Sequence, residues 1–190
     1  DGDLAAVTER SRGVANQLNA GVKGLMKKNK VTVVEGVAKL TGPTTVQVGE
    51  RTLTAKNVIV ATGARARELP HLKADGERVW TYRHALVPPA MPSDLLVIGS
   101  GAIGVEFASF YSDMGAKVTI VEMLDRILPV EDAEISTFME KQLKKQGMTI
   151  RTKASVEKLE VGKDGVKATI SGEAQTFSHV IVAIGIAPNT

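Results

Sequence analysis

The first part of the chain shows helical spacing, followed by short runs of strand-forming residues. Between residues 4 and 28 the apolar side chains recur at steps of three, four or their sums, which predicts one long helix with an apolar face. Short β-branched runs come next, separated by Gly-Pro and Gly-Glu turns. They predict a strand, a small meander and a buried closing strand, over residues 31–34, 37–40, 44–48, 51–54 and 57–61.

The second half of the chain alternates strands with helices. Prolines interrupt any regular pattern between residues 64 and 93, so we expect a connector there. From Asp94 onward the pattern predicts helices over 102–114 and 133–146, and strands over 95–98, 118–121, 149–151, 155–160, 166–171, 175–177 and 179–185. This order predicts an α/β fold in which helices cover the faces of a parallel sheet.

Two segments of the chain repeat each other. Residues 57–63 (Asn-Val-Ile-Val-Ala-Thr-Gly) and 179–185 (His-Val-Ile-Val-Ala-Ile-Gly) agree at five of seven positions. A helix, a strand and a three-stranded meander are predicted before each of them, which indicates two related domains. Gly99 lies 86 residues before Gly185, and the same count back from Gly63 passes the first residue. We therefore expect the first copy to lack its opening strand and glycine loop, and the chain to be an internal fragment.

A glycine-rich loop opens the second copy. Residues 99–104 read Gly-Ser-Gly-Ala-Ile-Gly, a G-x-G-x-x-G pattern between an apolar strand and a helix. In a dinucleotide-binding fold, Gly99 would make the tight turn, Gly101 would let a pyrophosphate approach the backbone, and Gly104 would let helix and strand pack closely. Free N–H groups at the start of the helix would hold the phosphates. The alternative is an ordinary tight turn between strand and helix.

An acid follows at the position where such a fold holds a ribose. Glu122 ends the second strand, 18 residues beyond Gly104, and would accept hydrogen bonds from the adenosine ribose hydroxyls. Its carboxylate would repel a 2′-phosphate, so we expect NAD rather than NADP, although Arg126 is near enough in sequence to soften the repulsion. Glu106 is either a first-turn acid that complements the helix dipole or a residue that faces the nicotinamide.

Composition and charge narrow the possible functions. The chain has 190 residues, 24 Lys and Arg against 21 Asp and Glu, a net charge of +3, and no Cys. The charge balance gives no reason to expect a nucleic-acid partner, and no apolar stretch is long enough to cross a membrane. Without Cys we expect no disulfide, no thiolate metal site and no cysteine nucleophile in this chain. No signal peptide is recognised, so we expect a cytoplasmic protein.

Taken together, these segments resemble the flavin-dependent pyridine nucleotide–disulfide oxidoreductases. The resemblance rests on residues 97–106, 117–122, 58–63 and 180–189, and it covers nearly the whole chain. It implies a Rossmann-like NAD-binding domain, made of a parallel sheet and a three-stranded meander, inserted into an FAD-binding domain of similar fold. It assigns residues 1–70 to a partial FAD-binding domain, 71–93 to a connector and 94–190 to the NAD-binding domain.

The resemblance also implies which residues hold the two cofactors. NAD would be held by the glycine loop and the helix start, by the ribose acid, by a backbone contact to the adenine and by a glycine on the nicotinamide side: Gly99, Ser100, Gly101, Ala102, Ile103, Gly104, Val105, Glu106, Glu122, Val156 and Gly185. FAD would contact the backbone of Ala38 and the loop of Thr62, Gly63 and Ala64. Ala38 and Val156 are also explained as buried strand residues.

The same resemblance implies that the chain is part of a longer enzyme, the parent enzyme, with a known type of reaction. It would be a homodimer in a 2-oxoacid dehydrogenase complex, and it would oxidise a dihydrolipoyl group and reduce NAD⁺ through a redox disulfide and FAD. The disulfide, the first glycine loop and the family's His–Glu pair are missing here, so we assign no catalytic residue and expect the chain alone to be inactive. Ile186 stands where many relatives carry Arg, which weakens the expected fit near Gly185.

Other readings of the sequence stay open. The parent would alternatively be a related flavin disulfide reductase or an NADH oxidase. In another class, the chain would be a nucleotide-binding module without chemistry, or an inert scaffold piece held by partner chains.

Overall fold

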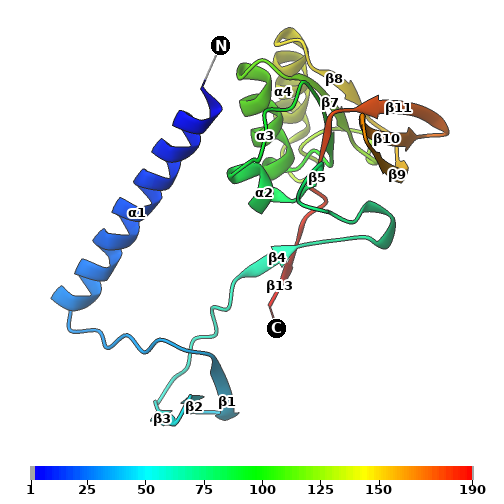
Figure 1. The fold of residues 1–190 in the computed structure, drawn as a ribbon. Coiled ribbons are helices and arrows are strands. Elements are labelled where there is room, and N and C mark those ends of the chain that lie inside the picture. Colours follow the sequence, from blue (N-terminus) through cyan, green and yellow to red (C-terminus); the bar gives the residue numbers. More distant parts are fainter. Residues whose placement is uncertain (1–2, 190) are drawn as a thin grey trace. The chain divides into compact units, whose positions relative to one another are not determined.

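The computed structural model describes residues 3–189 (Figure 1). Contacts divide the chain into two compact units, Glu9–Gly63 and Ala64–Asn189, the second together with the start of the chain up to Thr8. None of the helices in the described residues is long and apolar enough to cross a membrane.

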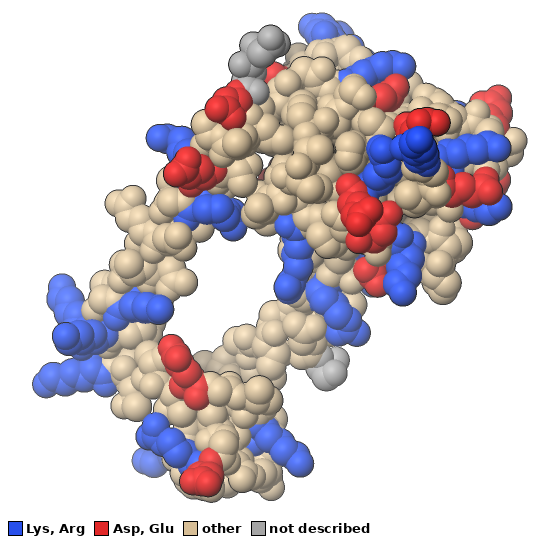
Figure 2. Space-filling view, viewed as in Figure 1, with Lys and Arg blue, Asp and Glu red and all other residues tan. Residues whose placement is uncertain are grey.

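A long helix supplies much of the first unit. α1 (Leu4–Lys28) confirms the predicted helix, but none of its residues is buried, and most of its apolar face is exposed. Its last turn holds Lys27 and Lys28, and Figure 2 shows Lys and Arg side chains gathered at that end of the helix. Positive charge at a helix C-terminus complements the helix dipole.

A small antiparallel sheet completes the unit Glu9–Gly63. The strands β1 (Ala38–Gly42), β2 (Thr45–Val48) and β3 (Arg51–Thr54) pair in that order and confirm the predicted meander.

The prediction of two other strands in this unit is wrong. Residues 31–34 and 57–61 form no strand, and Ile59 is 91% exposed. A strand needs a neighbour to share its backbone hydrogen bonds. No described strand pairs with either segment.

A five-stranded parallel sheet organises the unit Ala64–Asn189. Its strand order is β5-β12-β6-β7-β8, and each neighbouring pair is parallel. The bounds are Val79–Trp80 for β5, Asp94–Ile98 for β6, Lys117–Val121 for β7, Thr149–Arg151 for β8 and His179–Val182 for β12. Four of these strands confirm sequence predictions. The fifth, β5, lies in the segment expected to be a connector.

The two faces of this sheet are covered by different structures. Leu95 and Val97 of β6 pack into one buried cluster with residues of the helices α3 (Ala102–Asp113) and α4 (Ala133–Lys145). Leu96 and Ile98 alternate to the other face, where they join a cluster with an antiparallel meander, β11-β10-β9. The meander strands are β9 (Val156–Gly162), β10 (Gly165–Ile170) and β11 (Glu173–Phe177). The expectation of helices on the faces is therefore correct for one face only.

Local signals in the sequence set the ends of α4. Asp132 is its N-cap, and the Asp132 side chain accepts a hydrogen bond of 2.8 Å from the N–H of Glu134. Gly147 follows the helix with a positive φ of 92°, as expected for a glycine that terminates a helix.

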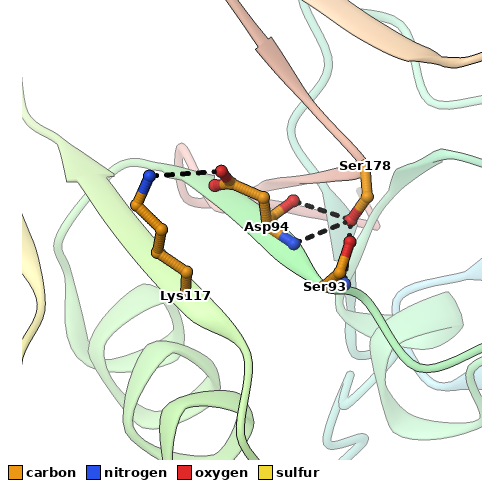
Figure 3. A network of polar contacts seen from close by, with 4 residues as sticks. All are labelled: Ser93, Asp94, Lys117 and Ser178. Carbon is orange, nitrogen blue, oxygen red and sulfur yellow. Dashed lines mark hydrogen bonds and ion pairs between the residues drawn. The ribbon is translucent and has the colours of Figure 1, made fainter.

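Ser178 ties together the amino ends of β6 and β12 (Figure 3). Its Oγ donates a hydrogen bond of 2.8 Å to the carbonyl of Asp94 and accepts bonds of 3.1 Å from the N–H groups of Ser93 and Asp94. Lys117 Nζ lies 3.4 Å from Asp94 Oδ2. Because Asp94 begins β6, this network lies at the edge of the sheet opposite the glycine loop, which follows the end of β6.

A short antiparallel pair brings together the two ends of the segment 64–188. β4 (Ala64–Ala66) pairs with β13 (Ile186–Pro188), with Ala64 opposite Pro188. The N–H of Arg67 donates to the carbonyl of Gly185 at 3.0 Å. Between β4 and β6 lie a short 3₁₀ helix, η1 (Pro70–Leu72), and a short helix, α2 (Tyr82–Leu86). The β4–β13 pair was not predicted from the sequence.

Candidate functional site

The predicted NAD-site loops meet at one edge of the parallel sheet. The strands β12, β6 and β7 are adjacent and parallel, so their carboxyl ends lie side by side. Hydrogen bonds link the chain just beyond each end: the N–H of Ala183 donates to Ile98 at 2.8 Å, and that of Gly99 donates to Val121 at 2.9 Å. In open α/β sheets this carboxyl edge is where ligands bind.

The three glycines of the loop have different surroundings. Gly99 has a φ of +95°, and a Cβ there would overlap the carbonyl oxygen of Ala183. A Cβ on Gly104 would overlap the carbonyl oxygen of Gly99. A Cβ on Gly101 would meet no atom within 4 Å. Gly99 and Gly104 are therefore required by packing, whereas Gly101 faces open space, which is where a ligand would approach the backbone.

The start of α3 is suited to an anion. Gly101 is the N-cap and offers no capping side chain, and the first turn contains no acid. The first N–H groups of a helix have no partner within the helix, and they carry a partial positive charge. Glu106 is exposed and lies beyond the first turn, so its interpretation as a first-turn acid is wrong.

Glu122 is bound tightly to the glycine loop. It is only 8% exposed, and its Oε2 accepts hydrogen bonds from the N–H of Ser100 at 3.0 Å and from the Ser100 hydroxyl at 2.6 Å. Its Oε1 accepts a bond of 2.9 Å from the N–H of Leu124. The carboxylate therefore fixes the loop against the end of β7.

Sequence reasoning did not find this pair. It placed Ser100 in the loop and Glu122 at the strand end, but it gave no contact between them. Two signals were available in principle: β6 and β7 are consecutive strands, and a hydroxyl within the loop can donate to an acid at the next strand end.

The remaining predicted NAD residues take several positions. In α3, Ala102 is exposed, Ile103 is half-buried, and the side chain of Val105 is buried in the core cluster. Val156 is buried at the start of β9, as its structural alternative also requires. Gly185 follows β12 with a φ of +107°. Whether each contacts NAD stays a prediction.

The predicted FAD residues fall in both units, with Ala38, Thr62 and Gly63 in Glu9–Gly63 and Ala64 at the start of Ala64–Asn189. Ala38 begins β1 and is exposed, so its interpretation as a buried strand residue is wrong. Thr62 and Gly63 precede β4, Gly63 has a φ of +73°, and Ala64 is the first residue of β4. Their role toward FAD stays a prediction.

Other features of the described residues do not add to this site. An open pocket of about 510 Å³ lies at β4, α2 and β13, and none of the predicted site residues lines it; its lining is Arg65, Ala66, Arg67, Glu68, Thr81, Arg83, His84 and Ala187. Between residues 3 and 189 no group of three or more His, Cys, Asp or Glu side chains is arranged to hold a metal ion.

Comparison with known proteins gives concordant matches. The chain is 52% identical over 199 residues to a dihydrolipoyl dehydrogenase of Zymomonas mobilis, covering 100% of the chain and 43% of that enzyme. Among solved structures it is similar to LpdA from Mycobacterium tuberculosis, with a TM-score of 0.90, 30% identity, and coverage of 100% of this chain and 44% of that one. The Cu(II) complex of the HOCl-induced flavoprotein disulfide reductase RclA from Escherichia coli gives a TM-score of 0.86 at 27% identity, again covering 100% of this chain and 44% of that one.

The chain thus spans less than half the length of these relatives. Residues 2–190 match the family described as pyridine nucleotide-disulphide oxidoreductase, which is nearly the entire sequence. The mixed α/β fold, with its five-stranded parallel sheet and its antiparallel sheets, agrees with that match. The chain therefore belongs to the pyridine nucleotide-disulphide oxidoreductase family.

Proposed function

We propose that residues 94–190 form the Rossmann-like NAD(H)-binding domain of a dihydrolipoyl dehydrogenase, that residues 1–70 belong to its FAD-binding domain, and that residues 71–93 connect the two. The observation that carries the proposal is the carboxyl edge of the parallel sheet, where an open Gly101 and an uncapped α3 stand beside a buried acid. The donor and acceptor groups present there fit a dinucleotide.

Each part of the edge would bind a different part of NAD. The backbone of the glycine loop and the start of α3 would hold the pyrophosphate, because they offer N–H groups and no competing side chain. Glu122 would accept a hydrogen bond from the adenosine ribose. Gly185 would lie on the nicotinamide side and the Val156 backbone beside the adenine. When bound, NAD⁺ supplies the hydride acceptor, and the protein orients it.

The other half of the reaction requires groups beyond this sequence. A redox disulfide needs two Cys, and the chain has none. Ala38, Thr62, Gly63 and Ala64 would contribute part of an FAD site. The parent would act as a homodimer within a 2-oxoacid dehydrogenase complex. The chain by itself should then bind NAD(H) without turning over dihydrolipoamide.

A second candidate function is a related flavin disulfide reductase. It is supported by the similarity to RclA, whose backbone matches this chain along its full length. It shares the NAD(H)-binding role proposed here and differs in the substrate of the complete enzyme.

Titration of the 190-residue chain with NADH, followed by nicotinamide fluorescence, tests the proposed site. We expect saturation with NADH, and an affinity for NADPH at least about tenfold lower, because Glu122 is buried next to the ribose position and a 2′-phosphate would meet its carboxylate. Equal binding of both nucleotides would contradict the role of Glu122. Binding of neither would contradict the proposal that these residues hold NAD(H) on their own.

A further inference from the structure

Resting on the proposed function, we infer that Ser100 is a positioning residue that sets nucleotide selectivity through Glu122. The buried hydroxyl of Ser100 holds the carboxylate in the one orientation that leaves a single acceptor position for a ribose hydroxyl. The inference depends on the hydrogen bonds around Glu122, on burial, and on the small number of acceptor positions that a carboxylate has.

Most of the acceptor capacity of Glu122 is used inside the protein. An ionised carboxylate has about four acceptor positions. Three are occupied, two on Oε2 by the N–H and hydroxyl of Ser100 and one on Oε1 by the N–H of Leu124. The remaining position is on Oε1. Glu122 can therefore accept one ribose hydroxyl without giving up a bond to the protein.

Burial makes this orientation costly to change. Ser100 is fully buried and Glu122 is 8% exposed, so a carboxylate that turned away would leave two N–H groups and a hydroxyl without an acceptor. The backbone of Glu122 is fixed as well, because its N–H donates to Arg151 at 2.9 Å and its carbonyl accepts from Ala154 at 3.0 Å. A 2′-phosphate therefore meets a charge that cannot move aside.

A single substitution can remove the Ser100 hydroxyl and leave the backbone hydrogen bonds to Glu122 in place. Ser100→Ala keeps the backbone N–H bond to Glu122 and deletes only the 2.6 Å bond from Oγ. The carboxylate then loses one of its two ties to the loop and can rotate.

The test measures NADH and NADPH dissociation constants of the 190-residue chain and its variants by fluorescence titration. For Ser100→Ala we expect NADH affinity to fall roughly tenfold and NADPH affinity to rise, because the freed carboxylate can turn away from a 2′-phosphate, so that the selectivity ratio falls. In the E122Q background the same substitution should change the ratio less than about twofold, because the charge on which it acts is absent.

Ser178→Ala is the matched control. It removes another hydroxyl with several backbone hydrogen bonds, at the opposite edge of the same sheet (Figure 3). It should lower the melting temperature and leave the NADH-to-NADPH ratio unchanged. If Ser100→Ala gives no cooperative melting transition, Ser100→Gly, which also removes the hydroxyl, provides the measurement.

The outcomes separate this inference from the proposed function. An unchanged ratio in a folded Ser100 variant overturns the inference alone, and so does tighter NADH binding, which would mean that the hydroxyl competes with the ribose. If the unsubstituted chain does not bind NADH, the proposed function fails and the inference fails with it.

Discussion

Single glycines in the loop differ in what they contribute, because each faces different atoms. A side chain on Gly104 meets the backbone of Gly99, which has no room to move in a packed turn. A side chain on Gly101 meets open space, and the φ of that residue, −66°, is one that any residue adopts. Stability and binding should therefore respond to different positions of the same motif.

Gly104→Ala and Gly101→Ala should separate these two effects. Gly104→Ala should lower the free energy of unfolding by about 3 kcal/mol, because its methyl group overlaps the backbone. Gly101→Ala should stay within about 0.5 kcal/mol of the unsubstituted chain and bind NADH at least about tenfold more weakly. Urea unfolding and NADH titration measure the two effects. Similar loss of stability in both variants would contradict the assignment.

The protonation of His179 affects the stability of the strand pair β5–β12. It begins β12, it is 8% exposed, and its ring centroid lies 4.7 Å from that of Trp80 in β5. Burial, followed by the charge of Arg78, lowers the pKa of His179 below its usual 6.5, while Asp75 acts in the opposite direction. The folded protein thus favours the neutral ring.

This pKa predicts acid sensitivity of the β5–β12 pair. The neutral His179 ring contributes fully to the free energy of unfolding above pH 6.5, the ordinary pKa of histidine. This contribution is lost as the pH falls through the lower pKa that His179 has in the folded state. Urea unfolding across this range should show a free energy of unfolding that decreases on acidification. His179→Gln should make that slope shallower. The matched control is His71→Gln, at an exposed site, and it should leave the slope unchanged.

Periodicity was enough to predict most elements, and the two strands that it predicted wrongly share a cause. The repeated segments are the clearest case: His179–Val182 is a fully buried strand, whereas the corresponding residues 57–60 form no strand. The difference lies in the neighbours, because β12 is paired on both sides and no described strand pairs with 57–60.

Short elements and side-chain contacts could not be predicted from the pattern of hydrophobic and polar positions. β5 has two residues and β4 and β13 have three, which is too few for a recognisable alternation. The loop glycines and Glu122 could be located from spacing. The contact between Ser100 and Glu122 depends on the side-by-side placement of β6 and β7, which spacing alone does not give.

At the scale of the whole molecule, apolar side chains in the unit Glu9–Gly63 are unusually exposed. Val37 is 90% exposed and Ile59 91% exposed, and α1 has no buried residue. Contiguous exposed apolar surface favours association.

We therefore expect the 190-residue chain to self-associate in a concentration-dependent way. Replacing Ile59 and Val60 with Thr should increase the monomer fraction measured by sedimentation velocity, because it removes exposed apolar area. Val130→Thr alters a valine with 89% exposure in the other unit, and it should not change association. A purely monomeric chain at all concentrations would contradict this expectation.

The pairing of β4 with β13 has a consequence for how such a protein can be rebuilt. Because Ala64 lies opposite Pro188, the polypeptide enters and leaves the segment between them at neighbouring points. A module with adjacent entry and exit points can be spliced into a host loop at little entropic cost. Residues 64–188 therefore have the geometry of an exchangeable module, and a homologous segment could be grafted in its place through two short joins.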